Sequence, residues 1–116
     1  MKPQHTAADF GYLTTTGRRS GRPHTVEIWF AAGDGVVYLL SGGGRRSDWC
    51  QNLEARPDAS FRIARTEYEV RGRRVTGRTE RALARRLVFE KYDSPDSGDL
   101  TGWRDSSEPY ALDLID

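Results

Sequence analysis

The sequence predicts a mainly β protein of the α+β class: an antiparallel barrel or half-open barrel of six strands, with short helices covering its ends. Three observations predict this fold. Several short runs alternate apolar and polar side chains with the period of a half-buried strand. The first of these runs are joined by short glycine-containing turns, which are typical of antiparallel hairpins. Helical spacing of apolar residues marks two segments, 47–56 and 79–92, and residues 1–11 could form one frayed helical turn.

Size and composition favour a single domain. A chain of 116 residues makes one domain, residues 1–116, with one core. The net charge of +1 gives no overall field that would draw the chain to nucleic acid or to a membrane surface. Cys50 is the only cysteine, so an intramolecular disulfide is excluded and a buried thiol is expected. Because there is neither an apolar run of spanning length nor a secretory pattern at the N-terminus, we expect a cytoplasmic protein without stable membrane insertion.

The first three strands are expected over residues 12–16, 25–31 and 36–40. The second alternates apolar and polar positions, and the third is apolar on both faces, as a covered central strand should be. Because hairpins join them, the first strand ends where the second begins, and the third returns to that same end.

Two turns rich in glycine and arginine, 17–23 and 41–47, flank these strands. Glycine lets the backbone approach a ligand, and guanidinium groups match phosphate and carboxylate. Ser47 is expected to cap a helix with Asp48 in its first turn, so a helix N-terminus should point at the same place. We therefore predict that the two turns lie side by side and form an anion site; the alternative is that they are merely solvated. The arginines expected to converge are Arg18, Arg19, Arg22, Arg45 and Arg46.

The helix over 47–56 is expected to bury one stripe, formed by Trp49, Cys50 and Leu53, and to stop before Pro57. Strands over 59–64 and 68–77 follow, the second bulged at Gly72. The arginines of that second strand are expected to be solvated or paired with carboxylates on a neighbouring strand.

Thr79 is expected to cap the second helix, which reaches Tyr92. Residues 93–107 are expected to be a loop in which Trp103 serves either as part of a lid or only as an anchor to the surface. A final strand over 110–115 has Tyr110 facing inward.

The series of motifs over about residues 12–58 resembles the deazaflavin-dependent nitroreductase family. The resemblance is carried by LTTTGRRSGRP, a strand, SGGG, and then the W-x-x-N-L of Trp49, Asn52 and Leu53. It implies a split β-barrel that binds coenzyme F420 and reduces organic substrates. It also implies a homodimer, in which the face of the second strand that carries Glu27 and Trp29 could be covered.

The resemblance assigns roles to residues of both turns. Arg18, Arg19 and Ser20 would hold the cofactor's phosphate, and a second group would hold the phosphate or the glutamate tail: Ser41, Gly42, Gly43, Gly44, Arg45 and Arg46. Two positions depart from the family's pattern: Glu27 stands where an apolar residue or proline would meet the ring, and Gly42 stands where a lysine is common.

Further roles concern the ring and the substrate. Trp49 could stack near the cofactor, and the substrate wall would be formed by Trp29, Trp103 and Tyr110. Proton donors would be water, Tyr110 or His24, since histidine titrates near neutral pH.

The sequence shows no metal-ligand spacing and no catalytic triad, so in an enzyme a cofactor must carry the chemistry. The reaction implied is hydride transfer from the reduced deazaflavin to a nitroaromatic, a quinone or an activated alkene. One alternative is an FMN-dependent oxidoreductase on the same barrel, although five clustered arginines favour the longer and more acidic ligand. Another is a non-catalytic module that binds a flavin or an oligonucleotide. The low net charge, and aromatic residues that do not interleave with basic ones, argue against specific nucleic-acid binding.

Overall fold

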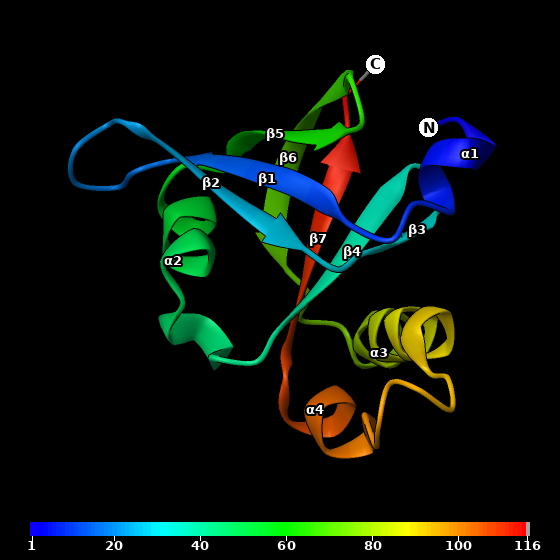
Figure 1. Ribbon diagram of the computed structural model, residues 1–116. Helices are drawn as coiled ribbons and strands as arrows, with labels where there is room; N and C mark the ends of the chain where they lie inside the picture. The colour runs from blue at the N-terminus through cyan, green and yellow to red at the C-terminus, as the bar shows by residue number, and fades with distance from the viewer. Residues whose placement is uncertain (116) are drawn as a thin grey trace.

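The computed structural model describes residues 1–115. Its strands form one curled antiparallel sheet in the order β2-β1-β5-β6-β7-β4-β3 (Figure 1). The strands are β1 (Gly11–Thr16), β2 (Pro23–Ile28), β3 (Ala31–Gly33), β4 (Val36–Ser41), β5 (Asp58–Ile63), β6 (Thr66–Arg74) and β7 (Glu108–Leu114). The expected fold class is therefore confirmed, as a half-barrel of seven strands rather than six.

The additional strand arises because the segment expected over 25–31 bends at Trp29 and Phe30. Before the bend β2 pairs with β1, and after it β3 pairs with β4, so one run of chain supplies both edge strands of the sheet. The backbone of Phe30 leaves the ladder because its N–H donates to the Tyr92 hydroxyl at 3.0 Å, and its carbonyl accepts from Lys91 Nζ at 2.9 Å. The side chain of Phe30 is fully buried, edge-on to Phe61. The bend is thus fixed by partners far away in the sequence.

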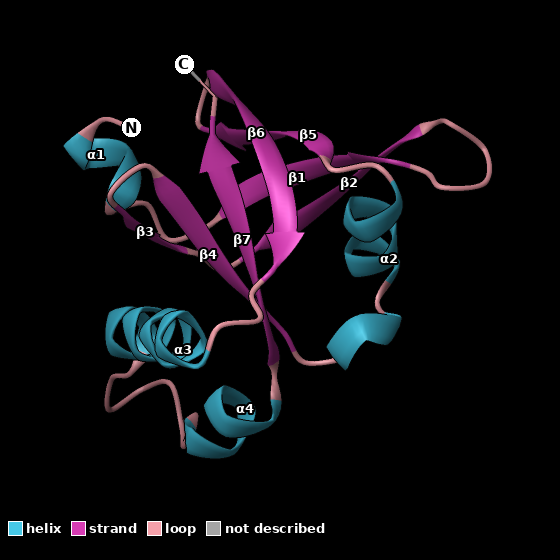
Figure 2. Ribbon diagram, turned by 180° about the vertical axis from the view of Figure 1, so that it is seen from behind, coloured by secondary structure: helices cyan, strands magenta, loops and turns pink. Residues whose placement is uncertain are grey.

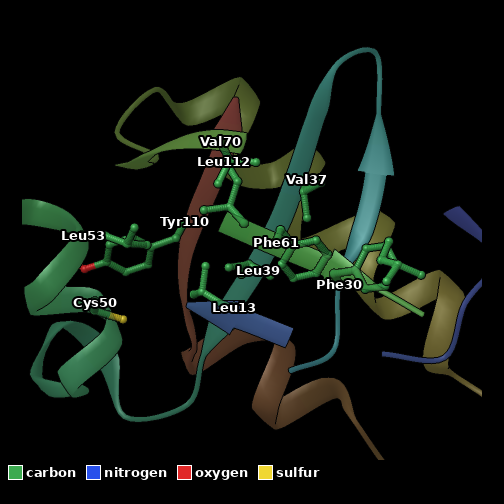
Figure 3. Packing of buried hydrophobic residues seen from close by; sticks show 11 residues of the cluster. Leu13, Phe30, Val37, Leu39, Cys50, Leu53, Phe61, Val70, Tyr110 and Leu112 are labelled. Atoms are coloured by element: carbon green, nitrogen blue, oxygen red, sulfur yellow. The ribbon is translucent and has the colours of Figure 1, made fainter. Parts of the chain in front are cut away.

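The core fills the inside of the curled sheet (Figure 3). β4 shows why this strand is apolar at every position. Val37 and Leu39 point into the barrel, whereas Tyr38 and Leu40 pack outward beneath a helix. The prediction that this strand is covered on both faces is confirmed.

Four α-helices and one short 3-10 helix accompany the sheet within residues 1–115. They are α1 (Pro3–Thr6), η1 (Gly44–Arg46), α2 (Asp48–Ala55), α3 (Arg78–Tyr92) and α4 (Thr101–Ser106). α2 and α3 pack on opposite faces of the sheet, the first against the barrel interior and the second beneath β4 and β7 (Figure 2). Among the described residues, no helix is long and apolar enough to cross a bilayer.

Three local expectations were wrong. Gly77, not Thr79, is the N-cap residue of α3, and it provides no side-chain cap. Residues 93–107 contain a helix, α4. Gly72 causes no bulge, since β6 pairs with both neighbours in an unbroken register. Packing is the reason for a glycine at position 72. A Cβ at this position would lie 2.5 Å from Cδ2 of Leu53, so the absence of a side chain lets α2 lie directly on the sheet.

The arginines of β6 are paired with carboxylates. Of the two predicted arrangements, solvation or ion pairing, the structure confirms ion pairing. Arg73 donates to Glu80 at 2.7 Å and to Asp113, across the strand pair, at 2.8 Å. Glu108 accepts from both Arg74 and Arg81. The guanidinium of Arg73 lowers the pKa of Glu80 to about 2, and that of Arg81 does the same for Glu108. This ion-pair layer fastens α3 to β6 and β7.

Candidate functional site

A hollow of about 260 Å³ lies between the β1–β2 turn and the first turns of α2. The β1–β2 hairpin contributes Gly17, Arg18, Arg19, Ser20 and His24, and α2 contributes Asp48 and Asn52. The first predicted anion turn is therefore a wall of an actual hollow, and His24 belongs to it.

The backbone of this turn is closed by its own hydrogen bonds. The N–H of Gly17 donates to the Arg22 carbonyl at 2.8 Å, and the N–H of Gly21 donates to the Gly17 carbonyl at 2.9 Å. Gly21 has φ +72°, a conformation that glycine adopts without strain. Ser20 Oγ accepts from the N–H of Arg22 at 3.1 Å, so its hydroxyl hydrogen is left to donate to a ligand.

Arg18 is held from below by Asn52. The Asn52 side-chain oxygen accepts from the backbone N–H of Arg18 at 3.1 Å and from its Nη1 at 2.8 Å. The amide nitrogen of Asn52 donates to Thr15 Oγ1 at 3.2 Å, and Asn52 is only 2% exposed. The remaining terminal nitrogen of Arg18, Nη2, lies 3.3 Å from the exposed carboxylate of Asp48. The guanidinium is thus fixed on one side and faces solvent on the other.

The donor set of the hollow fits a phosphate group. Two guanidinium groups and one hydroxyl are donors for phosphate oxygens, and the imidazole of His24 is another polar group in the wall. Asp48 is the single carboxylate in the lining. The site can therefore bind an anion, with one acidic group competing for it.

The second glycine-rich turn does not join this hollow. Arg45 pairs with Glu54 at 2.6 Å, and that hydrogen bond raises the pKa of Arg45 and lowers that of Glu54. Ser41 is 2% exposed, because its hydroxyl donates to the Gly44 carbonyl at 2.7 Å and also bonds Ser47 Oγ. Its hydroxyl therefore holds the turn closed.

The prediction that five guanidinium groups converge was wrong. Of the five, only Arg18 and Arg19 line the hollow; Arg22, Arg45 and Arg46 are exposed elsewhere on the two turns. The bend between β2 and β3 turns β4 away from the β1–β2 hairpin, so α2 lies between the hairpin loop and η1 (Figures 1 and 2). Strand alternation alone does not reveal such a bend.

Two of the three residues expected in a substrate wall do meet. Trp29 stacks on Tyr92 with ring centroids 4.2 Å apart and planes 2° from parallel, and it meets Trp103 edge-on at 5.7 Å. Trp29 is 41% exposed. A Cβ on Gly42 would lie 3.4 Å from Nε1 of Trp103, so the second glycine turn approaches this aromatic corner. The aromatic corner, formed by Trp29, Tyr92 and Trp103, lies beyond the far end of β2 from His24.

Tyr110 belongs neither to the hollow nor to the aromatic corner. Its ring is fully buried, and its hydroxyl donates to Glu54 at 2.7 Å, pointing toward α2 (Figure 3). Burial raises its pKa far above the usual range. A substrate cannot touch this ring, and the hydroxyl hydrogen is engaged by Glu54, so the structure contradicts the expected roles of Tyr110 in the substrate wall and in proton transfer.

Trp49 and Glu27, both expected to bind the cofactor, contact other residues of the protein. Trp49 is half-buried and packs edge-on against Tyr110 at 5.2 Å, as part of the core boundary. Glu27 is exposed and accepts from the Tyr12 hydroxyl at 3.2 Å. Cys50 is buried as expected, and burial raises the pKa of its thiol to about 11.

The amino-acid sequence shows to which protein family the chain belongs. A profile of the F420H2-dependent quinone reductase family matches residues 4–99, most of the chain. The chain belongs to this family. This family depends on the reduced deazaflavin, F420H2. The resemblance to deazaflavin-dependent reductases over residues 12–58 is therefore confirmed, and the protein is a member of an F420H2-dependent reductase family.

Solved structures agree with the fold of this quinone reductase family member. A conserved hypothetical protein from Mycobacterium tuberculosis superposes with a TM-score of 0.77 at 20% identity, covering 100% of this chain and 82% of the other. An F420H2-dependent reductase gives a TM-score of 0.74 at 18% identity, covering 90% and 94%. A third structure, a domain-swapped dimer, gives 0.73 at 19% identity, covering 90% and 80%. At these identities the likeness establishes the split-barrel fold.

Sequence reasoning missed three residues of this family member's candidate site. Asp48 and Asn52 both line the hollow, and their i, i+4 spacing on a predicted helix is the signal that places them on one face. From the sequence, Tyr92 is expected only to end the second helix. Its stacking on Trp29 depends on the bend, for which the sequence gives no signal.

Proposed function

We propose that this chain binds coenzyme F420 in its reduced form and reduces flat organic acceptors: nitroaromatics, quinones or activated alkenes. The observation that carries the proposal is the hollow, in which Arg18 and Arg19 are placed on the β1–β2 turn with the donors that a phosphate needs. Membership of the family supplies the identity of the cofactor.

Within this proposal Arg18, Arg19 and Ser20 hold the phosphate. His24 lies beside them, so we assign it to anion contact rather than to proton transfer. Arg46 is exposed on η1, on the far side of α2, where it can meet an acidic tail that extends from the hollow. Ser41 has a structural role, because its hydroxyl donates to the Gly44 carbonyl and so keeps this second turn closed.

The reduced deazaflavin supplies the hydride when it is bound. The chain itself binds, orients and shields. Trp29 and Trp103 offer flat apolar faces against which an aromatic acceptor can stack, and Tyr92 holds Trp29 in place. Within this proposal, water supplies the proton that completes the reduction. An apolar corner of this kind discriminates weakly between acceptors of similar shape.

We also propose a homodimer. The outer face of β1 and β2 carries exposed polar contacts, Tyr12 with Glu27 and Thr14 with Thr25, that would suit a second copy. A structural relative is a domain-swapped dimer. Light scattering at several concentrations tests this, and a monomer throughout would refute it. Residence in the cytoplasm stays a prediction, which cell fractionation tests.

The central test is a titration of the purified protein with oxidised F420, with FMN and with a short single-stranded oligonucleotide, followed by turnover with reduced F420. We expect binding of the deazaflavin that weakens with salt, and oxidation of its reduced form by a quinone or nitroaromatic. Tighter binding of FMN would move the function to a flavin enzyme. Binding without turnover on a broad acceptor panel would indicate a carrier.

A further inference from the structure

We propose that two neighbours on α2 act on the anion hollow in opposite directions. Asn52 is a positioning residue that fixes Arg18, and Asp48 is an exchangeable counter-ion that an incoming phosphate displaces. This inference rests on the proposed function in one respect, that the phosphate belongs to F420.

Asn52 has the features of a permanent support. It is 2% exposed, and both ends of its amide are engaged, one by Arg18 and the other by Thr15. The same oxygen holds the backbone and the guanidinium of Arg18, so it sets both the position of the turn and the direction of the fork. Because the amide is neutral, it orients the guanidinium without cancelling its charge.

Asp48 has the features of a temporary partner. Its side chain is 87% exposed, and its one ion pair to Arg18 spans 3.3 Å. It engages Nη2, the terminal guanidinium nitrogen that Asn52 does not hold. An exposed pair of this kind is weak. A phosphate that brings more charge and more acceptor oxygens would take its place on Nη2.

The positions of these two residues also decide how much of the Arg18 charge is left for a ligand. Neutral Asn52 stands where a carboxylate would neutralise Arg18 from inside, and the carboxylate is placed one helical turn earlier, at the mouth. The charge available to a ligand therefore depends on which of the two positions carries the acid, not on the net charge of the chain.

Exchanging amide and carboxylate tests this directly. Asp48→Asn removes the competitor, and we expect the dissociation constant for oxidised F420 to fall by about threefold to fivefold. Asn52→Asp places a charge against Arg18 inside the hollow, and we expect the dissociation constant to rise by at least about tenfold. The double exchange, Asp48→Asn with Asn52→Asp, has the same composition and net charge as the natural chain, and we expect it to bind weakly.

Two measurements separate this from a loss of structure. The slope of log affinity against log salt should steepen in Asp48→Asn and flatten in Asn52→Asp, while melting curves report folding. If Asn52→Asp does not fold, Thr15→Val removes the anchor of the Asn52 amide without adding charge, and it should weaken binding. Asp48→Asn that leaves affinity unchanged, or a double exchange that binds like the natural chain, would overturn the inference.

Inorganic phosphate is the second probe, because it tests the hollow independently of the cofactor. If phosphate binds and responds to the exchanges while F420 does not bind, the proposed function fails and the inference stands. If F420 binds and the exchanges have no effect, the inference fails and the proposed function stands. If neither ligand binds, both fail.

Discussion

The two glycine- and arginine-rich turns have similar compositions, yet their arginines are held in different ways. In the first, a buried neutral amide orients Arg18, and its acidic partner, Asp48, is an exposed side chain that a ligand can displace. In the second, Glu54 holds Arg45 and cancels that charge, and Glu54 is itself anchored by Tyr110. The number of arginines in a turn therefore does not measure its capacity for anions. What decides it is whether the group that orients each arginine is neutral or acidic.

The sharpest test of this difference compares alanine substitutions in the two turns. Arg18→Ala should weaken binding of F420 by about tenfold to a hundredfold, because a charge-assisted contact is lost from a fixed position. Arg45→Ala should weaken it by less than about threefold, because that charge is already paired. Titration calorimetry measures both. Arg65→Ala is the matched control, since Arg65 is exposed in the turn between β5 and β6. Equal effects of Arg18→Ala and Arg45→Ala would refute the comparison.

The placement of α2 can be disturbed without touching either turn. Gly72→Ala puts a Cβ against buried Leu53, so α2 must shift. We expect a loss of about 2 kcal/mol in the free energy of unfolding, measured in urea, together with weaker phosphate binding because Asn52 moves with the helix. Gly102→Ala is the control, since a Cβ at Gly102 meets nothing within 4 Å. If Gly72→Ala is as stable as this control, the close contact is not limiting.

Low pH tests how much the arginine–carboxylate pairs contribute to the free energy of unfolding, because protonation of the carboxylate breaks the ion pair. Glu80 and Glu108 have pKa values of about 2 in the folded state, against an ordinary value of 4.5. Their contribution is complete above about pH 4.5 and is lost as the pH falls toward 2, because the unfolded chain takes up protons first. We expect a loss of about 1 kcal/mol from each, since both are partly exposed.

Urea midpoints between pH 2 and 6 measure this loss. In Glu80→Gln the midpoint should be lower at pH 6 and should fall less steeply with acid. A midpoint of the natural chain that does not change with pH over this range would contradict the assignment.

The smallest expected effect concerns the anchor of the second turn. Tyr110→Phe removes the hydroxyl that donates to Glu54 and should cost about 1 kcal/mol of stability. Turnover should not change, because Tyr110 touches no ligand. Rates with reduced F420, measured beside thermal melts, check both. A large fall in turnover without a fall in stability would restore Tyr110 as a proton donor.

Much of the fold could be predicted from the sequence, because it follows from local pattern. The alternation that buries Val37 and Leu39 on one side and Tyr38 and Leu40 on the other is visible in the order of residues. The bend at Phe30 is not, since it depends on Tyr92 and Lys91, more than 60 positions along the chain. The same limit applied to the site. The first turn could be predicted from its own residues, but the directions of Arg18 and Arg45 are set by Asn52 and Glu54 on α2.

The bend has one more consequence. An open sheet normally ends in two exposed rows of backbone groups to which a strand of another molecule can add. Here β2 is cut short by Pro23 at one end and by the bend at the other, and β3 is only 3 residues long. The change of direction thus leaves the β3 margin too short to serve as a template and limits the β2 margin to 6 residues, which reduces the edge at which a small β protein can aggregate.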